Sequence, residues 1–377
     1  MNLRKFLSVI FILFVSVSTV FAADIYDSAP SFSPYYAGKV KAETLNEALE
    51  ELNYIRWLVG VPNNVVLNSE YTNKAQHGAV LLDAINTLTH TPSKPSDMSE
   101  EFYSLGYDST THGNLFVSQL ISNGNIYGNV SLSSSLKGYM DDSDSHNISA
   151  VGHRRWLMNP RLKQTGFGIS TRKGYSVTYV IEEFGEVNTQ EDYQRYLQWL
   201  EWPISDEFIT WPTSKHNHPL TYFNSQTAWS VTLDRNIFDE CDINSVNVTL
   251  TCLNDNETWI FNKTSSNGDF YISENNVAYD ECIIFRPNDI SNYENGEVWR
   301  VNISGLKRKD GGSGNISYTV TFTDASTDYD DDYVYDYRNT LGGEGSSGVS
   351  CNAGNGIFSL ILISGIPHVK KFLRVRI

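Results

Sequence analysis

The stretch that decides the fold is 152–160, Gly-His-Arg-Arg-Trp-Leu-Met-Asn-Pro, because the chain changes character on either side of it. Before it, apolar residues recur at steps of three and four and predict an amphipathic helix over residues 44–58. After it, residues 166–170 and 175–181 form short apolar runs typical of strands. Helices first and strands later indicate an α+β domain.

Two further helices are expected before this stretch, over residues 69–88 and 131–140. For the helix at 44–58, Thr44 and Glu47 have the spacing of a capping box. The first part of the chain is therefore predicted to be rich in helices that cover a small sheet.

Five short motifs between residues 42 and 186 carry a family resemblance. They are Leu52-Asn53-Tyr54-Ile55-Arg56, Leu88-Thr89-His90-Thr91-Pro92, Gly113-Asn114-Leu115, Gly152-His153-Arg154-Arg155-Trp156 and Gly166-Phe167-Gly168. In order, spacing and residue type they resemble the bacterial CAP domain, the SCP-like extracellular family. The resemblance implies an α-β-α sandwich with a surface cleft, where two histidines and two acidic residues hold a divalent metal in some members.

The resemblance also assigns individual residues to this cleft. His90 and His153 match the two family histidines. The family glutamate is replaced by Gly113, so one acidic ligand is lost. The second acidic position falls on Asp142, with Asp141 as the alternative. We therefore expect an incomplete set of metal ligands.

Chemistry supports a weak zinc site at His90, His153 and Asp142, because two neutral imidazoles with one carboxylate leave an open coordination position. His112 is a conceivable substitute for the missing carboxylate. The two family histidines have no metal-motif spacing of their own, so a purely structural role for them stays open.

The expected ligand cleft further includes Asp141, Asn114 and Arg154. Arg154 and its neighbour Arg155 could contact an anionic ligand. The favoured alternative is that the two side chains are solvated or form salt bridges.

A second domain is expected over residues 213–323, after a linker at 187–212 that contains a short helix at 191–200. In this part the hydrophobic period changes to two, and about seven short strands alternate with Asn, Asp and Gly turns, which predicts a β-sandwich. Three cysteines lie here, so at most one disulfide can form among them: Cys241, Cys252 and Cys282. We expect this domain to act as a spacer, with carbohydrate binding as the alternative.

The two ends of the chain have the composition of export and anchoring signals. Residues 1–22 have the pattern of a secretory signal peptide cleaved after Ala22, with an uncleaved membrane anchor as the alternative. Residues 324–350 form an acidic stretch predicted to be a flexible stalk. Residues 351–377 resemble C-terminal sorting signals of the SYNERG-CTERM and GlyGly-CTERM kind, which implies a processing or anchoring role for Cys351. A final buried strand or helix is the alternative there.

The net charge excludes one class of partner. With 28 Lys and Arg against 44 Asp and Glu, the charge of −16 argues against nucleic acid as a partner.

We expect an exported protein, held at the cell surface through its C-terminal segment, whose cleft binds a small lipid-like or peptide ligand. A metal-dependent hydrolase of peptide or cell-wall material ranks second, because no His-Glu-x-x-His or Gly-x-Ser-x-Gly motif is present. A structural or adhesive surface protein is the third candidate, and the oligomeric state is not predicted.

Overall fold

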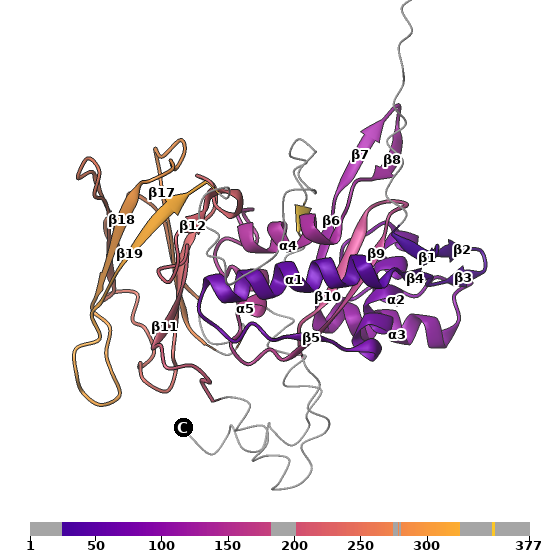
Figure 1. Ribbon diagram of the computed structural model, residues 1–377, viewed down its shortest axis with the longest axis horizontal. Helices are drawn as coiled ribbons and strands as arrows, with labels where there is room; N and C mark the ends of the chain where they lie inside the picture. Colours follow the sequence, from indigo (N-terminus) through magenta and orange to yellow (C-terminus); the bar gives the residue numbers. More distant parts are fainter. Residues whose placement is uncertain (1–24, 182–200, 274–277, 279, 325–348, 351–377) are drawn as a thin grey trace, which may run out of the picture.

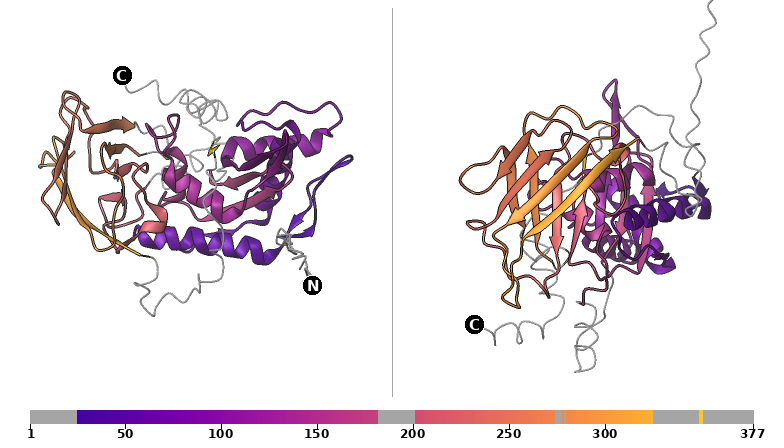
Figure 2. Two further views of the ribbon diagram at one scale, coloured as in Figure 1. Left: turned by 90° about the horizontal axis from the view of Figure 1, so that it is seen from above. Right: turned by 60° about the vertical axis from the view of Figure 1, so that its left-hand side comes forward.

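Two domains lie side by side in the computed structural model, which describes residues 25–181, 201–273, 278, 280–324 and 349–350 (Figure 1). The first domain contains the helices and the second is built almost entirely from strands, so the expected α+β class is confirmed. Figure 2 shows the same division from two further directions. The predicted signal peptide 1–22, the helix at 191–200 and the segment 351–377, with Ala22 and Cys351, lie outside the described residues.

The first domain has one central sheet between two layers of helices. Its helices are α1 (Ala42–Leu58), α2 (Ser69–Ile85), α3 (Glu100–His112), α4 (Leu132–Asp141) and α5 (Gly152–Leu157). The sheet has the order β20-β6-β10-β9-β5, formed by β20 (Val349–Ser350), β6 (Gly113–Val117), β10 (Tyr175–Tyr179), β9 (Gln164–Ser170) and β5 (Val66–Leu67). None of the helices in the described ranges is long and apolar enough to cross a membrane.

The two faces of the sheet pack against different helices because side chains alternate along each strand. On one face Leu115 of β6 and Val177 of β10 pack against Ala75 and Ala79 of α2. On the other face Phe116 packs in the core that α1, α4 and α5 share. The α-β-α arrangement implied by the family resemblance is therefore the one observed.

The first domain also contains three short pairs of strands. They are β1 (Tyr26–Ser28) with β4 (Lys39–Val40), β2 (Ser31–Phe32) with β3 (Tyr35–Tyr36), and β7 (Gln119–Ser122) with β8 (Asn125–Gly128). In Figure 1 the β7–β8 hairpin projects from the body of the domain. None of the three pairs was anticipated from the sequence.

Helix boundaries depart from the sequence expectations at identifiable positions. Helix α1 begins at Ala42 after Lys41, whose side chain makes no capping hydrogen bond. Thr44 therefore lies inside the first turn, and the predicted capping box is wrong. Helix α4 does start with a capping box, in which Ser131 and Ser134 each accept a backbone hydrogen bond from the other.

The second domain consists of two stacked sheets. One has the order β11-β13-β17-β16, formed by β11 (Phe208–Trp211), β13 (Trp229–Leu233), β17 (Cys282–Pro287) and β16 (Gly268–Ser273). The other has the order β12-β19-β18-β14-β15, formed by β12 (His218–Pro219), β19 (Ile316–Thr323), β18 (Val298–Ser304), β14 (Asn247–Cys252) and β15 (Thr258–Phe261). A short 3-10 helix, η1 (Leu220–Tyr222), follows β12.

All the strands expected from the period of two are present in this sandwich. Strand β11, however, lies within the predicted linker 187–212 and pairs with β13. The sandwich thus begins before residue 213, and Trp211 of this strand is fully buried in the core. Cys241, Cys252 and Cys282 are free thiols, so the disulfide considered for them is not formed.

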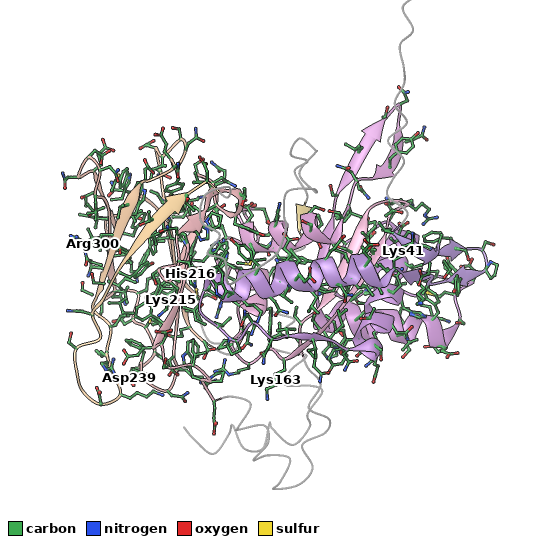
Figure 3. The ribbon with its side chains drawn as sticks, viewed as in Figure 1. Lys41, Lys163, Lys215, His216, Asp239 and Arg300 are labelled. Atoms are coloured by element: carbon green, nitrogen blue, oxygen red, sulfur yellow. The ribbon has the colours of Figure 1, made fainter. Side chains whose placement is uncertain are left out.

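The two domains are in direct contact along the end of α1. The Thr213 hydroxyl donates to the Leu58 carbonyl at 2.5 Å, and the His216 ring stacks on Trp57 with ring centroids 3.8 Å apart. Figure 3 labels His216 and its neighbour Lys215 beside this end of the helix. The sandwich is therefore docked on the first domain.

Candidate functional site

His153 stands near the start of α5 with only 3% of its surface exposed. Its Nδ1 lies 2.7 Å from Oδ1 of Asp142, and the other carboxylate oxygen accepts the Arg154 backbone N–H at 3.0 Å. An ionised carboxylate only accepts hydrogen bonds, so Nδ1 carries the proton and the neutral ring has its lone pair on Nε2. Nε2 of His153 is buried and has no hydrogen-bond partner among the described residues.

His90 follows α2 and is buried in a similar way, with 8% of its surface exposed. Its Nδ1 lies 2.6 Å from the Thr110 carbonyl, which can only accept a hydrogen bond. The neutral ring of His90 therefore also has its lone pair on Nε2. Burial and, to a smaller extent, the nearby His153 lower the pKa of His90 from 6.5 to about 4, although the hydrogen bond with the Thr110 carbonyl raises it.

Two imidazoles with Nδ1 held by an oxygen acceptor form the donor arrangement common at metal sites, where the acceptor fixes the ring and Nε2 binds the ion. Each oxygen of Asp142 accepts one hydrogen bond, from His153 or from the Arg154 N–H, so the carboxylate orients His153, and its role as a ligand stays a prediction. Within the described ranges no group of three or more His, Cys, Asp or Glu side chains is placed to hold a metal. The two histidines thus each have the donor arrangement that a metal would need, and the metal site expected from them stays a prediction.

Asn114 supports this histidine pair from the sheet below. Its side-chain N–H donates to the His153 backbone carbonyl at 3.0 Å. Its backbone carbonyl accepts a hydrogen bond from the Tyr139 hydroxyl at 2.9 Å. The Tyr139 ring in turn stacks on His153 with centroids 5.3 Å apart. Asn114 was predicted to line the cleft, and the structure places it in contact with the backbone that carries His153.

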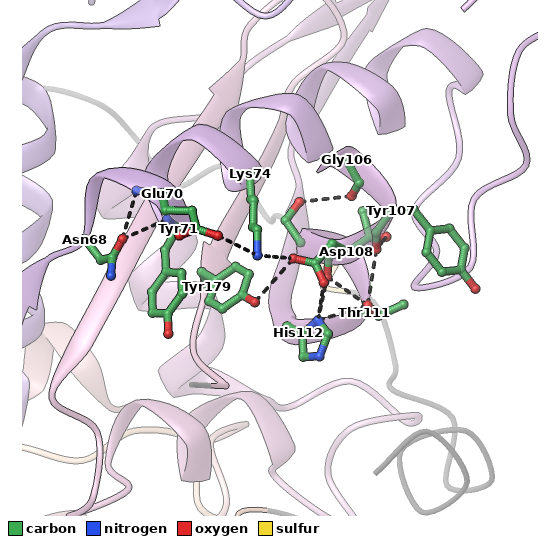
Figure 4. Close-up of polar contacts among 12 residues, drawn as sticks. Asn68, Glu70, Tyr71, Lys74, Gly106, Tyr107, Asp108, Thr111, His112 and Tyr179 are labelled. Carbon is green, nitrogen blue, oxygen red and sulfur yellow. Dashed lines mark hydrogen bonds and ion pairs between the residues drawn. The ribbon is translucent and has the colours of Figure 1, made fainter. Parts of the chain in front are cut away.

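His112 is held in a different cluster, on the α2 and α3 side of the sheet (Figure 4). Its Nδ1 lies 2.8 Å from the Asp108 carbonyl and 3.1 Å from the carboxylate of the same residue. Lys74 also binds this carboxylate at 3.0 Å, and the His112 ring stacks on Tyr179. Burial raises the pKa of Asp108, but His112 and Lys74 outweigh it and lower the pKa overall. The contacts of His112 thus hold its Nδ1, and its role as a substitute ligand stays a prediction.

Arg154 and Asp141 turn toward the second domain instead of the cleft. The guanidinium of Arg154 is fully buried and donates to oxygens of both domains: the carbonyls of Met140, Asp141 and Ala228 and the hydroxyl of Ser230. Asp141 accepts the Thr227 hydroxyl at 2.5 Å. Arg154 cannot meet a ligand in the cleft because its donors are satisfied between the domains, which corrects that expectation. Burial lowers the pKa of Arg154 to about 10.

Sequence reasoning missed the residues that orient the two histidines. Thr110 orients His90 through its backbone carbonyl, which every residue type has, so the sequence gives no sign of this contact. Tyr139 lies two positions before Asp141, and the sequence alone assigned it no role. Ser230 and Thr227 come from the second domain, so only the docked structure reveals them.

Comparison with known proteins bears on the first domain. A model of the CAP family, described as the cysteine-rich secretory protein family, matches residues 49–184. No curated protein and no solved structure matches the chain. The matched stretch begins within α1 and contains His90, Asn114 and His153. Residues 49–184 therefore form a CAP domain, to which the chain adds a docked β-sandwich.

Proposed function

We propose that this chain is an exported, envelope-held protein whose CAP cleft binds a small lipid-like or peptide ligand, with His90 and His153 holding a divalent metal. The observation that supports this most directly is the buried Nε2 of His153, which has no hydrogen-bond partner among the described residues. A buried polar atom without a partner is costly unless something else binds it.

The residues of the cleft have separate tasks in this proposal. His90 and His153 supply neutral nitrogen donors, because Thr110 and Asp142 hold the proton on each Nδ1. A bound zinc ion would offer a positive charge and open coordination positions to an oxygen of the ligand. The lowered pKa of His90 keeps its ring neutral in mildly acidic surroundings, where an ordinary histidine would be protonated.

Export and anchoring are part of the proposal and rest on the sequence of the two ends. Residues 1–22 supply the signal peptide, and Cys351 lies in the sorting segment. Mass spectrometry of the mature protein tests both points, because cleavage after Ala22 and modification at Cys351 each change the mass of one terminal peptide. An intact N-terminus together with an unmodified full-length C-terminus would contradict this part.

The cleft is tested by calorimetric titration of the full-length protein with zinc chloride at pH 7.5. We expect one site in the wild type and at least a tenfold weaker affinity in His90→Ala and in His153→Ala. The matched control is His146→Ala, because His146 is a loop histidine whose side chain is 75% exposed. The control should bind zinc like the wild type.

Two further measurements separate the candidate functions. Binding of a fluorescent fatty acid that His153→Ala weakens supports a lipid-like ligand. Zinc-dependent hydrolysis of a peptide or of cell-wall fragments that is lost in both histidine variants would instead show an enzyme. A wild type that binds no zinc would contradict the metal proposal and leave the adhesive function as the alternative.

A further inference from the structure

We propose that the β-sandwich positions His153, so that the binding cleft of the CAP domain is complete only when the second domain is docked on it. The ligand of this cleft rests on the proposed function above, but the orientation of His153 is measurable without any ligand. The residues that carry the inference lie between α4 and α5 and in the facing sandwich, where Figure 1 shows α5 on the side of its domain next to the second one.

The backbone before His153 is in a conformation that needs support from outside. Val151, two residues earlier, has φ 42° and ψ 48°, in the left-handed region that branched side chains avoid. Such a residue persists only where its surroundings hold it. The side chain of Val151 is fully buried in a cluster that the second domain provides, formed with Ile148 by Ala228, Cys282 and Ile284.

Arg154 connects the sandwich to the carboxylate that orients His153. Its backbone N–H donates to Oδ2 of Asp142 at 3.0 Å, while Oδ1 of the same carboxylate holds His153. Its guanidinium donates to the Ala228 carbonyl at 2.7 Å and to the Ser230 hydroxyl at 3.1 Å. A shift of the sandwich would therefore move Arg154 and, through its backbone N–H, the Asp142 carboxylate that holds His153.

Asp141 provides a second connection one residue before the orienting carboxylate. It accepts the Thr227 hydroxyl at 2.5 Å, and Thr227 and Ala228 directly precede strand β13, which contains Ser230. The last turn of α4 is thus fixed to the sandwich at the point where the chain leaves toward His153.

Two more arginines of the CAP domain enter the sandwich and hold it in place. Arg155 donates to the Ser273 hydroxyl at 2.7 Å and to the Asp280 carbonyl. Arg161 binds the Asp280 carboxylate with two nitrogens, at 2.6 and 3.2 Å, and both side chains are 2% exposed. Buried, bidentate contacts of this kind fix orientation as well as distance. The second domain is thus held rigidly against the turn that carries His153.

The test uses the full-length protein with two changes in the sandwich, Thr227→Val and Ser230→Ala, singly and combined. Neither residue touches the cleft, and both changes keep the size of the side chain nearly constant. Proton–nitrogen NMR of the imidazoles reports the tautomer and the Nε2 shift of His153 without metal, and cobalt absorption reports affinity. We expect the double variant to shift the Nε2 signal of His153 and to weaken cobalt binding about tenfold. The single variant Thr227→Ser should keep the wild-type signal of His153, since it keeps the hydroxyl that Asp141 accepts.

The matched control is Ser317→Ala, which removes a sandwich hydroxyl that binds Asn302 at 2.7 Å on an exposed face. It should leave the His153 signal and the cobalt affinity unchanged. Thermal unfolding confirms that each variant is folded. A folded double variant with the wild-type His153 signal would overturn the inference, whatever its affinity. A wild type that binds no cobalt, but whose His153 signal moves in the double variant, would overturn only the metal proposal.

Discussion

Two buried histidines in this molecule, His153 in the CAP domain and His218 in the sandwich, are held in opposite ways. Asp142 accepts a hydrogen bond from Nδ1 of His153, which leaves the lone pair on Nε2. At His218 the backbone N–H of Thr213 donates to Nδ1 at 3.2 Å, so the neutral ring carries its proton on Nε2. Aromatic rings surround His218 edge-on, those of Trp211, Phe223 and Phe322.

The difference shows that burial alone does not distinguish a binding histidine from a core histidine. Burial and, to a smaller extent, the positive charge of Arg154 lower the pKa of His218 to about 3. His90 in the cleft is lowered to about 4 by the same main cause. What separates the sites is the group that meets Nδ1, because it decides which nitrogen offers a lone pair to a ligand.

Acid is the change with the largest expected effect, and it affects both sites. For His90 and His218 the pKa in the folded protein lies below the ordinary value of 6.5, so unfolding takes up protons. Their contribution to stability is complete above pH 6.5 and is lost as the pH falls toward 4. We expect the free energy of unfolding to drop on the order of 5 kcal/mol between pH 7.5 and pH 4, measured by urea denaturation. A stability that is constant over this range would contradict the burial of both rings.

Removal of the carboxylate at Asp142 should disrupt the cleft site alone. Asp142→Ala leaves Nδ1 of His153 and the Arg154 N–H without their buried acceptor, which should cost about 3 kcal/mol in urea denaturation. Zinc affinity should fall at least tenfold. The control is Asp142→Asn, whose amide oxygen can still accept one of the two hydrogen bonds, so it should be milder in both measurements. Equal effects of the two changes would contradict this expectation, because they would show that a single amide acceptor gives no support to His153 or to the Arg154 N–H.

Replacement of His218 tests whether this histidine contributes only to the core of the sandwich. His218→Phe suits the surrounding aromatic rings but leaves the Thr213 N–H without its acceptor, so we expect a loss of about 1 kcal/mol at pH 7.5. The loss of stability from pH 7.5 to 4 should shrink by roughly half, since one of the two buried histidines is gone. Zinc titration should be unaffected. A variant with weaker zinc binding would mean that His218 acts on the cleft.

The smallest effect is expected at His146. Its side chain is 75% exposed and lies 3.7 Å from Asp144, a contact that solvent screens. His146→Ala should change the free energy of unfolding by less than about 0.5 kcal/mol and leave zinc affinity unchanged. A measurable loss of zinc binding would place the metal in the loop and not in the cleft.

The sequence predicted the parts of the fold that periodicity controls. Strands of the sandwich with alternating residues, such as β14 and β18, were found within one or two residues of their bounds, because one face of each is buried. Helix α3 (Glu100–His112) was missed, since most of its buried residues are small or polar: Gly106, Ser109, Thr110 and Thr111. Strand β11 was taken for linker because Pro212 follows it directly.

The candidate site could be predicted only in part. His90 and His153 were identified through the family motifs, and they lie near enough for His153 to lower the pKa of His90. The orientation of Arg154 and Asp141 toward the sandwich could not be foreseen, because it depends on contacts with residues 74 or more positions away in the chain. Sequence spacing carries no information about which way a buried arginine points once a second domain covers it.

The central claim is that His90 and His153 both offer an Nε2 lone pair to one shared site. Proton–nitrogen NMR of the full-length protein at pH 7.5 tests it directly, before and after one equivalent of zinc is added. We predict that both rings carry their proton on Nδ1, that His218 carries it on Nε2, and that zinc shifts the Nε2 signals of His90 and His153 together. An Nε2-protonated His153, or signals that stay unchanged when zinc is added, would contradict the claim.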